Sequence, residues 1–378
     1  MKQQIIQVYN KHYKKLLIIP ALLLILSLLV ITNTYIKTGD YIYRDVSLTG
    51  GTTITFSSNI SVSEMENLIL GTVPDTSVMS LSDNTGKQTR LIITTKSSPE
   101  IIKPELEKIL GYELTDENSS MEFSGSSLSN DFYNQLVRAL IFAFILMAFV
   151  VFFVFGESMK IKVYCAILTL ICARLTFPSS RFLNAIIIIL GILFFVYGLY
   201  LSKQKKDYYY LLASFLAFII FLIFPVYFVI LPIGILLILI YTFVSVPSIA
   251  VIFAAFADIL FALALVNLLG IKISSAGIVA FLMLIGYSVD TDILLTTRVL
   301  RRKNESVNSS MFSAFKTGIT MTLTAIAAVG IALIVVYKYE TVLNQIFSIM
   351  IIGLSFDILN TWLTNAVMIK WFVEKKHG

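Results

Sequence analysis

Four carboxylates fall inside or at the ends of strongly apolar stretches of this chain: Asp258, Asp290, Asp292 and Asp357. A charged side chain at the middle of a membrane costs from about 3 to more than about 10 kcal/mol. Such residues are kept where they face the interior of a helix bundle and pair with polar groups, or where they carry protons or other ions. The four residues are therefore candidates for a proton or ion relay.

Asp290 is the strongest of these candidates on the sequence. Gly286, four residues before it, allows a neighbouring helix to approach closely or the helix to break locally. Asp290 and Asp292 lie on different faces of a helix, so they cannot both hold one ion unless the helix unwinds. Asp292 fits a relay or a structural role about equally well. Asp258 and Asp357 fit better as polar partners between helices.

Two basic side chains lie near the same apolar stretches. Lys316 opens a later stretch and either pairs with a carboxylate of a neighbouring helix or sits at the membrane interface; both interpretations stay open. Arg298 follows Asp290 by eight residues, and we interpret it as an anchor whose charge reaches the interface. Lys316 is therefore the basic candidate for the relay.

Several other chemistries are excluded by the residues that carry them. The two histidines, His12 and His377, lie near the ends of the sequence, which excludes a histidine metal site within the membrane and argues against a Ser-His-Asp triad. The sequence contains no GxxxxGK[ST] loop and no HExxH motif. Cys165 and Cys172 are two helical turns apart, too far for a disulfide. We expect no enzyme activity, metal or cofactor, so energy must come from a partner or an ion gradient.

The composition is that of a membrane protein. The chain has 378 residues, of which 57% are hydrophobic and 14% charged, whereas about a quarter are charged in soluble proteins. Apolar stretches approach or exceed the roughly 18 residues that cross a bilayer. The first, Leu16–Ile36, is interpreted as a signal anchor because no cleavage site follows it. The basic residues gather in short loops beside these stretches, which indicates cytoplasmic loops and argues against nucleic acid.

Charge and hydropathy predict five parts. Residues 37–132 are polar, and from Lys37 to Asp131 seven Lys/Arg stand against fourteen Asp/Glu, a net charge of −7. With this part outside the membrane, ten spans place nearly all the basic clusters, and both termini, in the cytoplasm. The predicted parts are 1–36 (N-terminus and first span), 37–132 (extracytoplasmic domain), 133–156 (second span), 157–244 (four extra spans) and 245–378 (remaining spans and C-terminus).

The polar part predicts a small α+β domain. Ser61 with Glu64 three residues later forms a capping box at the start of a helix. The strands and helices follow the order β-α-β-β-α-β, which is that of a ferredoxin-like fold. In chain order these elements are Thr52–Ser57, Val62–Leu70, Ser77–Leu81, Arg90–Thr95, Pro99–Leu110 and Met121–Ser124.

Several segments together resemble SecF proteins of the archaeal type, within the SecD/SecF family. Ile285–Leu300, with the sequence IGYSVDTDILLTTRVL, resembles the family's fourth-span motif and is the most specific match. Gly50 and Gly51 resemble the paired glycines at the start of its exposed domain. Three further segments resemble its third, fifth and sixth spans: Val246–Ile259, Lys316–Thr324 and Ile352–Asn365. The resemblance covers 1–156 and 245–378.

The resemblance implies a function that composition alone does not indicate. SecF pairs with SecD in a pseudosymmetric membrane bundle related to the RND transporters, and the pair assists the Sec translocon in moving unfolded polypeptides outward across the lipid membrane. Bacterial relatives are thought to use the proton gradient. Carried over, Asp290 and Asp292 are the proton-site candidates and Lys316 their basic partner. This chain has Thr291 where bacterial SecF has its acid, and Asp290 where SecD has its own.

Other functions stay open. An RND-like exporter subunit for lipids or small molecules shares the fold but needs a second half, and the fourth-span motif is not duplicated here. An intramembrane aspartyl protease needs a GxGD motif, which the segment from Gly286 to Asp290 does not match. A structural scaffold for the translocon is also possible. Residues 157–244 exceed the six-span plan of the family and receive no functional interpretation.

Overall fold

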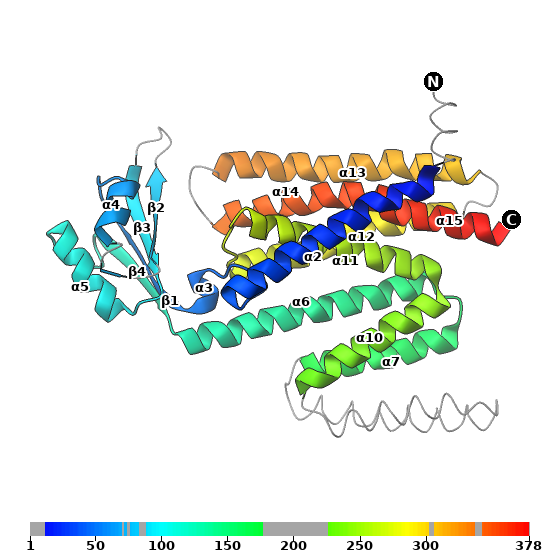
Figure 1. Cartoon of the computed structure of the whole chain (residues 1–378), viewed down its shortest axis with the longest axis horizontal. Helices are drawn as coiled ribbons and strands as arrows, with labels where there is room; N and C mark the ends of the chain where they lie inside the picture. The colour runs from blue at the N-terminus through cyan, green and yellow to red at the C-terminus, as the bar shows by residue number, and fades with distance from the viewer. Residues whose placement is uncertain are drawn as a thin grey trace.

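The computed structural model describes residues 12–377 apart from 70–71, 74–75, 83–87, 177–225, 302–305 and 337–341. A long bundle of helices carries a small α/β domain at one end, and the first described helical residues and the end of the last helix lie toward the opposite end (Figure 1). There the hydroxyl of Tyr13 donates a hydrogen bond to Glu374 over 2.5 Å. The first and last helices of the bundle are therefore tied together at the end remote from the α/β domain.

The α/β domain is the ferredoxin-like fold that the sequence predicts. All neighbouring strands are antiparallel, in the spatial order β2-β3-β1-β4. Alternate residues of β1 and β3, such as Ile54 and Ile93, are fully buried under the helices, as expected when one face of a sheet is covered. The strands are β1 (Gly51–Phe56), β2 (Ser77–Ser82), β3 (Gln88–Thr95) and β4 (Ser119–Ser124).

Two helices supply the rest of this core. α4 spans Val62–Ile69 and α5 spans Pro99–Leu110. The predicted capping by Ser61 is confirmed, because its Oγ accepts the backbone N–H of Glu64 over 3.3 Å. Both helices are amphipathic, so each buries one apolar stripe against the sheet.

Six helical segments within the described ranges are long and apolar enough to cross a membrane. α2, α6 and α13 expose many large apolar side chains, as lipid-facing helices do. α7 and α10 are not among the six. The six are Tyr13–Thr38 (η1 and α2), Ser126–Phe155 (α6), Val246–Leu268 (α11), Ser275–Arg301 (α12), Val307–Val336 (α13) and Val342–Lys375, which runs through α14 (Val342–Asn360), η3 (Thr361–Asn365) and α15 (Ala366–His377).

The centre of the bundle is formed by α11, α12 and α14. In the most apolar stretch of α11, 61% of the residues are buried, against 6% for α13. Small residues allow the close approach: a Cβ on Gly353 of α14 would overlap the side chain of Leu284 of α12. By contrast, the expected close approach or break at Gly286 is absent, because α12 is continuous there and nothing lies within 4 Å of an added Cβ.

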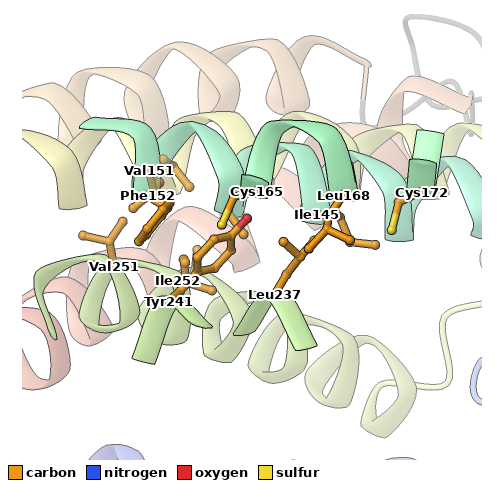
Figure 2. Packing of buried hydrophobic residues seen from close by; sticks show 13 residues of the cluster. Ile145, Val151, Phe152, Cys165, Leu168, Cys172, Leu237, Tyr241, Val251 and Ile252 are labelled. Atoms are coloured by element: carbon orange, nitrogen blue, oxygen red, sulfur yellow. The ribbon is translucent and has the colours of Figure 1, made fainter. Parts of the chain in front are cut away.

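The extra segment contributes two described helices, α7 (Met159–Thr176) and α10 (Val226–Val244). They pack on α6 and α11 through an apolar cluster, in which the rings of Phe152 and Tyr241 stack with centroids 4.5 Å apart (Figure 2). Cys165 and Cys172 are buried in the same cluster and are not joined by a disulfide, as predicted. The other two predicted spans, 183–201 and 209–224, lie outside the described residues.

The connection from α2 to the sheet is fixed to the bundle. Ile273, in the loop between α11 and α12, donates its N–H to the carbonyl of Tyr43 over 2.6 Å and accepts the N–H of Asp45 over 2.9 Å. Leu48, in the short helix α3 (Val46–Thr49), is fully buried against the bundle core. The α/β domain is therefore attached through a firmly packed segment.

The paired glycines lie at the end of this segment. Gly50 has φ +83°, and a Cβ there would overlap the backbone of Ser126 at the start of α6; a Cβ on Gly51, with φ +138°, would overlap the carbonyl of Thr95. Both conformations are strained for residues with a side chain. Two glycines are therefore required where the chain enters β1 between β3 and α6.

Candidate functional site

Three carboxylates are buried in the centre of the bundle. Asp258 belongs to α11, Asp292 to α12 and Asp357 to α14, and each is fully buried. Each of the three helices packs against the other two. The structure thus places Asp258, Asp292 and Asp357 in one buried core, where their charges would repel one another.

Asp258 is held by a residue of the neighbouring helix. Ser288 of α12 donates its hydroxyl to Oδ2 of Asp258 over 2.5 Å. One turn earlier on α11, the carbonyl of Ala254 accepts the side-chain amide of Asn360 over 2.6 Å. Because Asn360 follows Asp357 by three residues, these bonds connect α11, α12 and α14 at the level of the carboxylates.

Asp292 is bound by an amide from the last span. Asn365 donates from Nδ2 to Oδ1 of Asp292 over 2.8 Å and to its backbone carbonyl over 3.2 Å. The same amide lies 3.3 Å from the hydroxyl of Thr296, which is one turn further along α12. Asn365 therefore forms hydrogen bonds with both a side chain and the backbone of α12.

Asp357 is surrounded by hydroxyl groups, among them those of Thr361 and Thr322. Thr361, one turn later, donates to Oδ1 over 3.2 Å, and Thr322 of α13 lies 3.4 Å from Oδ2. All three residues are buried. Hydroxyl groups both donate and accept hydrogen bonds, so they can follow a change in the protonation of the carboxylate.

No lysine or arginine is bonded to these three carboxylates in the interactions found among the described residues. Oδ1 of Asp258 and Oδ2 of Asp292 are buried and lack a hydrogen-bond partner among the described residues. The charges of Asp357 and Asp258 would both repel a charge on Asp292. Unpaired buried charge is costly, so the arrangement favours carboxylates that are neutralised by protons or by a cation.

The last span changes its helix type beside the carboxylates. Residues Thr361–Asn365 form a π-helical turn between α14 and α15. Three polar residues of this turn, Thr361, Thr364 and Asn365, are buried. π-helical turns occur often at functional sites because the wider turn redirects side chains and loosens the backbone hydrogen bonds.

Asp290 lies away from the buried carboxylates. Its side chain is exposed on α12, together with those of Val279, Met283 and Tyr287. The sequence ranked Asp290 above Asp292 as a relay candidate, whereas in the structure Asp292 is the residue that faces the interior. The positions are two residues apart and so point in different directions, and only packing determines which direction is inward.

The basic candidates also lie apart from the cluster. The side chain of Lys316 is exposed, and pairing with a carboxylate of the neighbouring helix is not observed among the described interactions of this residue. Arg298 donates to the carbonyl of Ser313 over 2.8 Å and to the hydroxyl of Thr317 over 2.9 Å, both on α13. Arg298 therefore joins α12 to α13 rather than reaching only toward the membrane interface.

Sequence reasoning missed the neutral members of the site. Ser288, Asn360 and Asn365 supply the hydrogen bonds to the carboxylates or between their helices. A buried asparagine inside an apolar span is a signal that could have found two of them, since polar groups in membranes are kept where they bond between helices.

The fold and the site together define a multi-pass helical membrane protein with a polar, acidic centre. Residues 215–375 match the family described as protein export membrane protein SecD/SecF, C-terminal. This part of the chain, which includes all three buried carboxylates, is similar to the SecD/SecF family. The match begins before residue 245, so α10 lies within the matched range.

Curated relatives named protein-export membrane protein SecF agree with this. The chain is 46% identical over 135 residues to that of Pyrococcus furiosus, covering 36% of this chain and 45% of the relative. It is 50% identical over 133 residues to that of Methanocaldococcus jannaschii, covering 34% and 47%. The matched part thus spans about half the length of these relatives.

The overall fold is similar to a solved structure. SecDF of Thermus thermophilus, described as a translocon-associated membrane protein, superimposes with a TM-score of 0.53 at 15% identity, covering 96% of this chain and 38% of that chain. At this identity the likeness concerns the fold alone. It confirms the predicted class of a SecF-like bundle with one exposed α+β domain.

Proposed function

We propose that this chain is a SecF-like subunit of a SecD–SecF complex that assists the Sec translocon in moving unfolded polypeptides across the cytoplasmic membrane. The observation that carries the proposal is the family match over residues 215–375, which includes the buried cluster of Asp258, Asp292 and Asp357. The curated relatives of the same part are named for protein export.

Coupling to an ion gradient is part of the proposal. The three carboxylates lie in the membrane-spanning core without a bonded basic residue among the described interactions, and two of their oxygens have no partner there. Each step that takes up or releases a proton or a monovalent cation changes the repulsion within the cluster. Because α11, α12 and α14 all carry a member, such a change acts directly on the packing of the bundle.

A SecD-like partner is supported by the exposed face of α12. Asp290 follows Ser275, the start of α12, by fifteen residues and precedes Arg301, its end, by eleven, which puts it about 22 Å and about 16 Å from the two ends of the helix. An exposed carboxylate near mid-membrane is costly against lipid. A partner helix that donates a hydrogen bond to Asp290 removes this cost, so we assign this face to the SecD-like subunit.

The orientation of the chain in the membrane follows from the distribution of its charged residues. The start of η1 and the end of α15 lie at the end of the bundle remote from the α/β domain (Figure 1). Lys14, Lys15 and Lys375 lie at that end, whereas the α/β domain is acidic. Under the positive-inside rule the termini are cytoplasmic and the domain is extracytoplasmic.

Copurification and depletion test this function. The native chain is isolated in mild detergent, and its partners are identified; separately, the export of a secreted protein is followed after the chain is depleted. Recovery of a SecD-like subunit and translocon subunits, with slowed export, supports the proposal. Recovery with a lipid-export or small-molecule-export machinery, and unchanged protein export, overturns it and favours the RND-like exporter.

A further inference from the structure

The two edges of the four-stranded sheet differ in regularity. β4 pairs with β1 in an uninterrupted register of six residues, from Gly51 with Ser124 to Phe56 with Ser119. At the other edge, the register between β2 and β3 shifts at Leu81 and Ser82. Bulges and irregular pairing hinder the addition of a further strand at a sheet edge. A regular edge instead leaves a row of N–H and C=O groups available to pair with another strand.

The open edge of β4 also lacks the usual protection. Its sequence, SSMEFS, contains no lysine and no proline, the residues that most often keep edge strands from pairing. Ser120 and Glu122 are exposed. Phe123 is 57% exposed although it is a large apolar residue. An edge of this kind fits one chemistry best, the main chain of another extended peptide.

An exposed apolar strip continues from this edge. Leu128 and Phe132, on one face of the first turns of α6, are 69% and 44% exposed. α6 has 30 residues and is about 45 Å long, whereas the hydrocarbon core of a membrane is about 30 Å thick. The first turns of α6, with the polar sequence SSLSNDFYNQ, therefore stand outside the hydrocarbon, and lipid tails do not cover Leu128.

We propose that the open edge of β4, with Phe123 and Leu128 beside it, binds an extended segment of an unfolded polypeptide by strand addition. This inference rests on the proposed function, which supplies unfolded polypeptide on this side of the membrane. Main-chain bonds to β4 hold any sequence in the extended state, and Phe123 and Leu128 favour segments with apolar residues. Binding is therefore tolerant of sequence, as an export factor requires.

Site-directed photo-crosslinking tests the inference in the full-length protein in its membrane. A photoreactive residue is placed at Ser120 or Glu122 of β4, and for comparison at Met79 of β2, which is 46% exposed on the same sheet. A precursor is stalled during export. We expect crosslinks to the precursor from β4 to exceed those from β2 by at least about tenfold, and Phe123→Asp to reduce them while Met79→Asp does not. Equal or absent crosslinking from β4 overturns the inference.

A second measurement separates this inference from the proposed function. Hydrogen exchange is measured on the purified full-length chain with and without reduced, alkylated lysozyme, which cannot refold. Protection of β4 from exchange, without protection of β2, supports the edge site. If depletion of the chain then leaves export unchanged, only the proposed function is rejected. If export slows when the chain is depleted but β4 shows no protection, the edge site is wrong and the proposed function is still supported.

Discussion

Asn365 donates a hydrogen bond from its side-chain amide to Oδ1 of Asp292 over 2.8 Å, although the two residues are 73 positions apart in the chain. The bond joins the π-helical turn of the last span to the helix that carries the family's most specific motif. It fixes one oxygen of Asp292 and leaves Oδ2 buried without a partner among the described residues. Under the proposed function, this oxygen is the one that would take up a proton.

Asp292→Asn is expected to slow protein export by at least about tenfold while the protein remains folded. The amide keeps an oxygen acceptor for Asn365 but cannot gain or lose a proton. Because a neutral group also ends the repulsion from Asp357 and Asp258, the thermal unfolding temperature should stay the same or rise. Export rates in cells and unfolding in detergent check the two parts.

Ser288→Ala is the matched control for this change, because it removes a hydrogen bond to Asp258 without removing an ionisable group. We expect a smaller effect on export and a loss of stability of about 1–3 kcal/mol from the unsatisfied buried carboxylate. Wild-type export by the Asp292→Asn protein would contradict an ion-relay role for this residue.

Asp290→Leu is expected to leave the isolated chain stable and to weaken its association with a SecD-like subunit. Asp290 is exposed on α12, so leucine there costs the lone subunit nothing and removes the acceptor that a partner helix would use. Copurification in mild detergent measures the association. Leu323→Asn, at a 51% exposed position of α13, serves as the comparison and should leave the complex intact; equal recovery for both variants would exclude this face as the interface.

Gly50→Ala should destabilise the protein by well over the roughly 1 kcal/mol that a positive φ alone costs. At Gly50 an added Cβ overlaps the backbone of Ser126, which cannot move aside as a side-chain end could. Gly39 has a similar φ, +77°, but its ψ is 0° rather than 160°, and nothing lies within 4 Å of an added Cβ, so Gly39→Ala reports the cost of a left-handed helical conformation in open space. Thermal unfolding and protease resistance of the α/β domain give the comparison, and equal effects would show that crowding at Ser126 is unimportant.

Gly353→Ala should loosen the contact between α12 and α14, because the new methyl group overlaps the buried side chain of Leu284. Leu284→Ala alone should cost about 2–5 kcal/mol through the cavity it creates. The double variant should be more stable than the sum of the two changes predicts, since the methyl group enters that space. Strict additivity of the unfolding free energies would mean that the two residues do not share this contact.

The sequence determined the local elements and the class of protein. Stretches such as Val246–Leu268 can only be buried or cross a membrane, because their composition leaves no polar face. Alternation and capping placed Thr52–Ser57 and the helix after Ser61 within a residue or two of β1 and α4. The fourth-span motif indicated a resemblance to the SecD/SecF family, and the residues that match this family include the motif.

Only the tertiary structure decided which polar residues share the centre. Asp290 and Asp292 have the same side chain and nearly the same neighbours in sequence, yet one is exposed and the other fully buried. The direction of each depends on which face of α12 meets α11 and α14, and polar residues such as Ser288, Asp290 and Thr291 lie on more than one face of this helix, so hydropathy does not single out the inward face. The contact between Asp292 and Asn365 likewise exists only because helices distant in sequence pack together, since side-chain pairing across a bundle is a property of packing and not of local spacing.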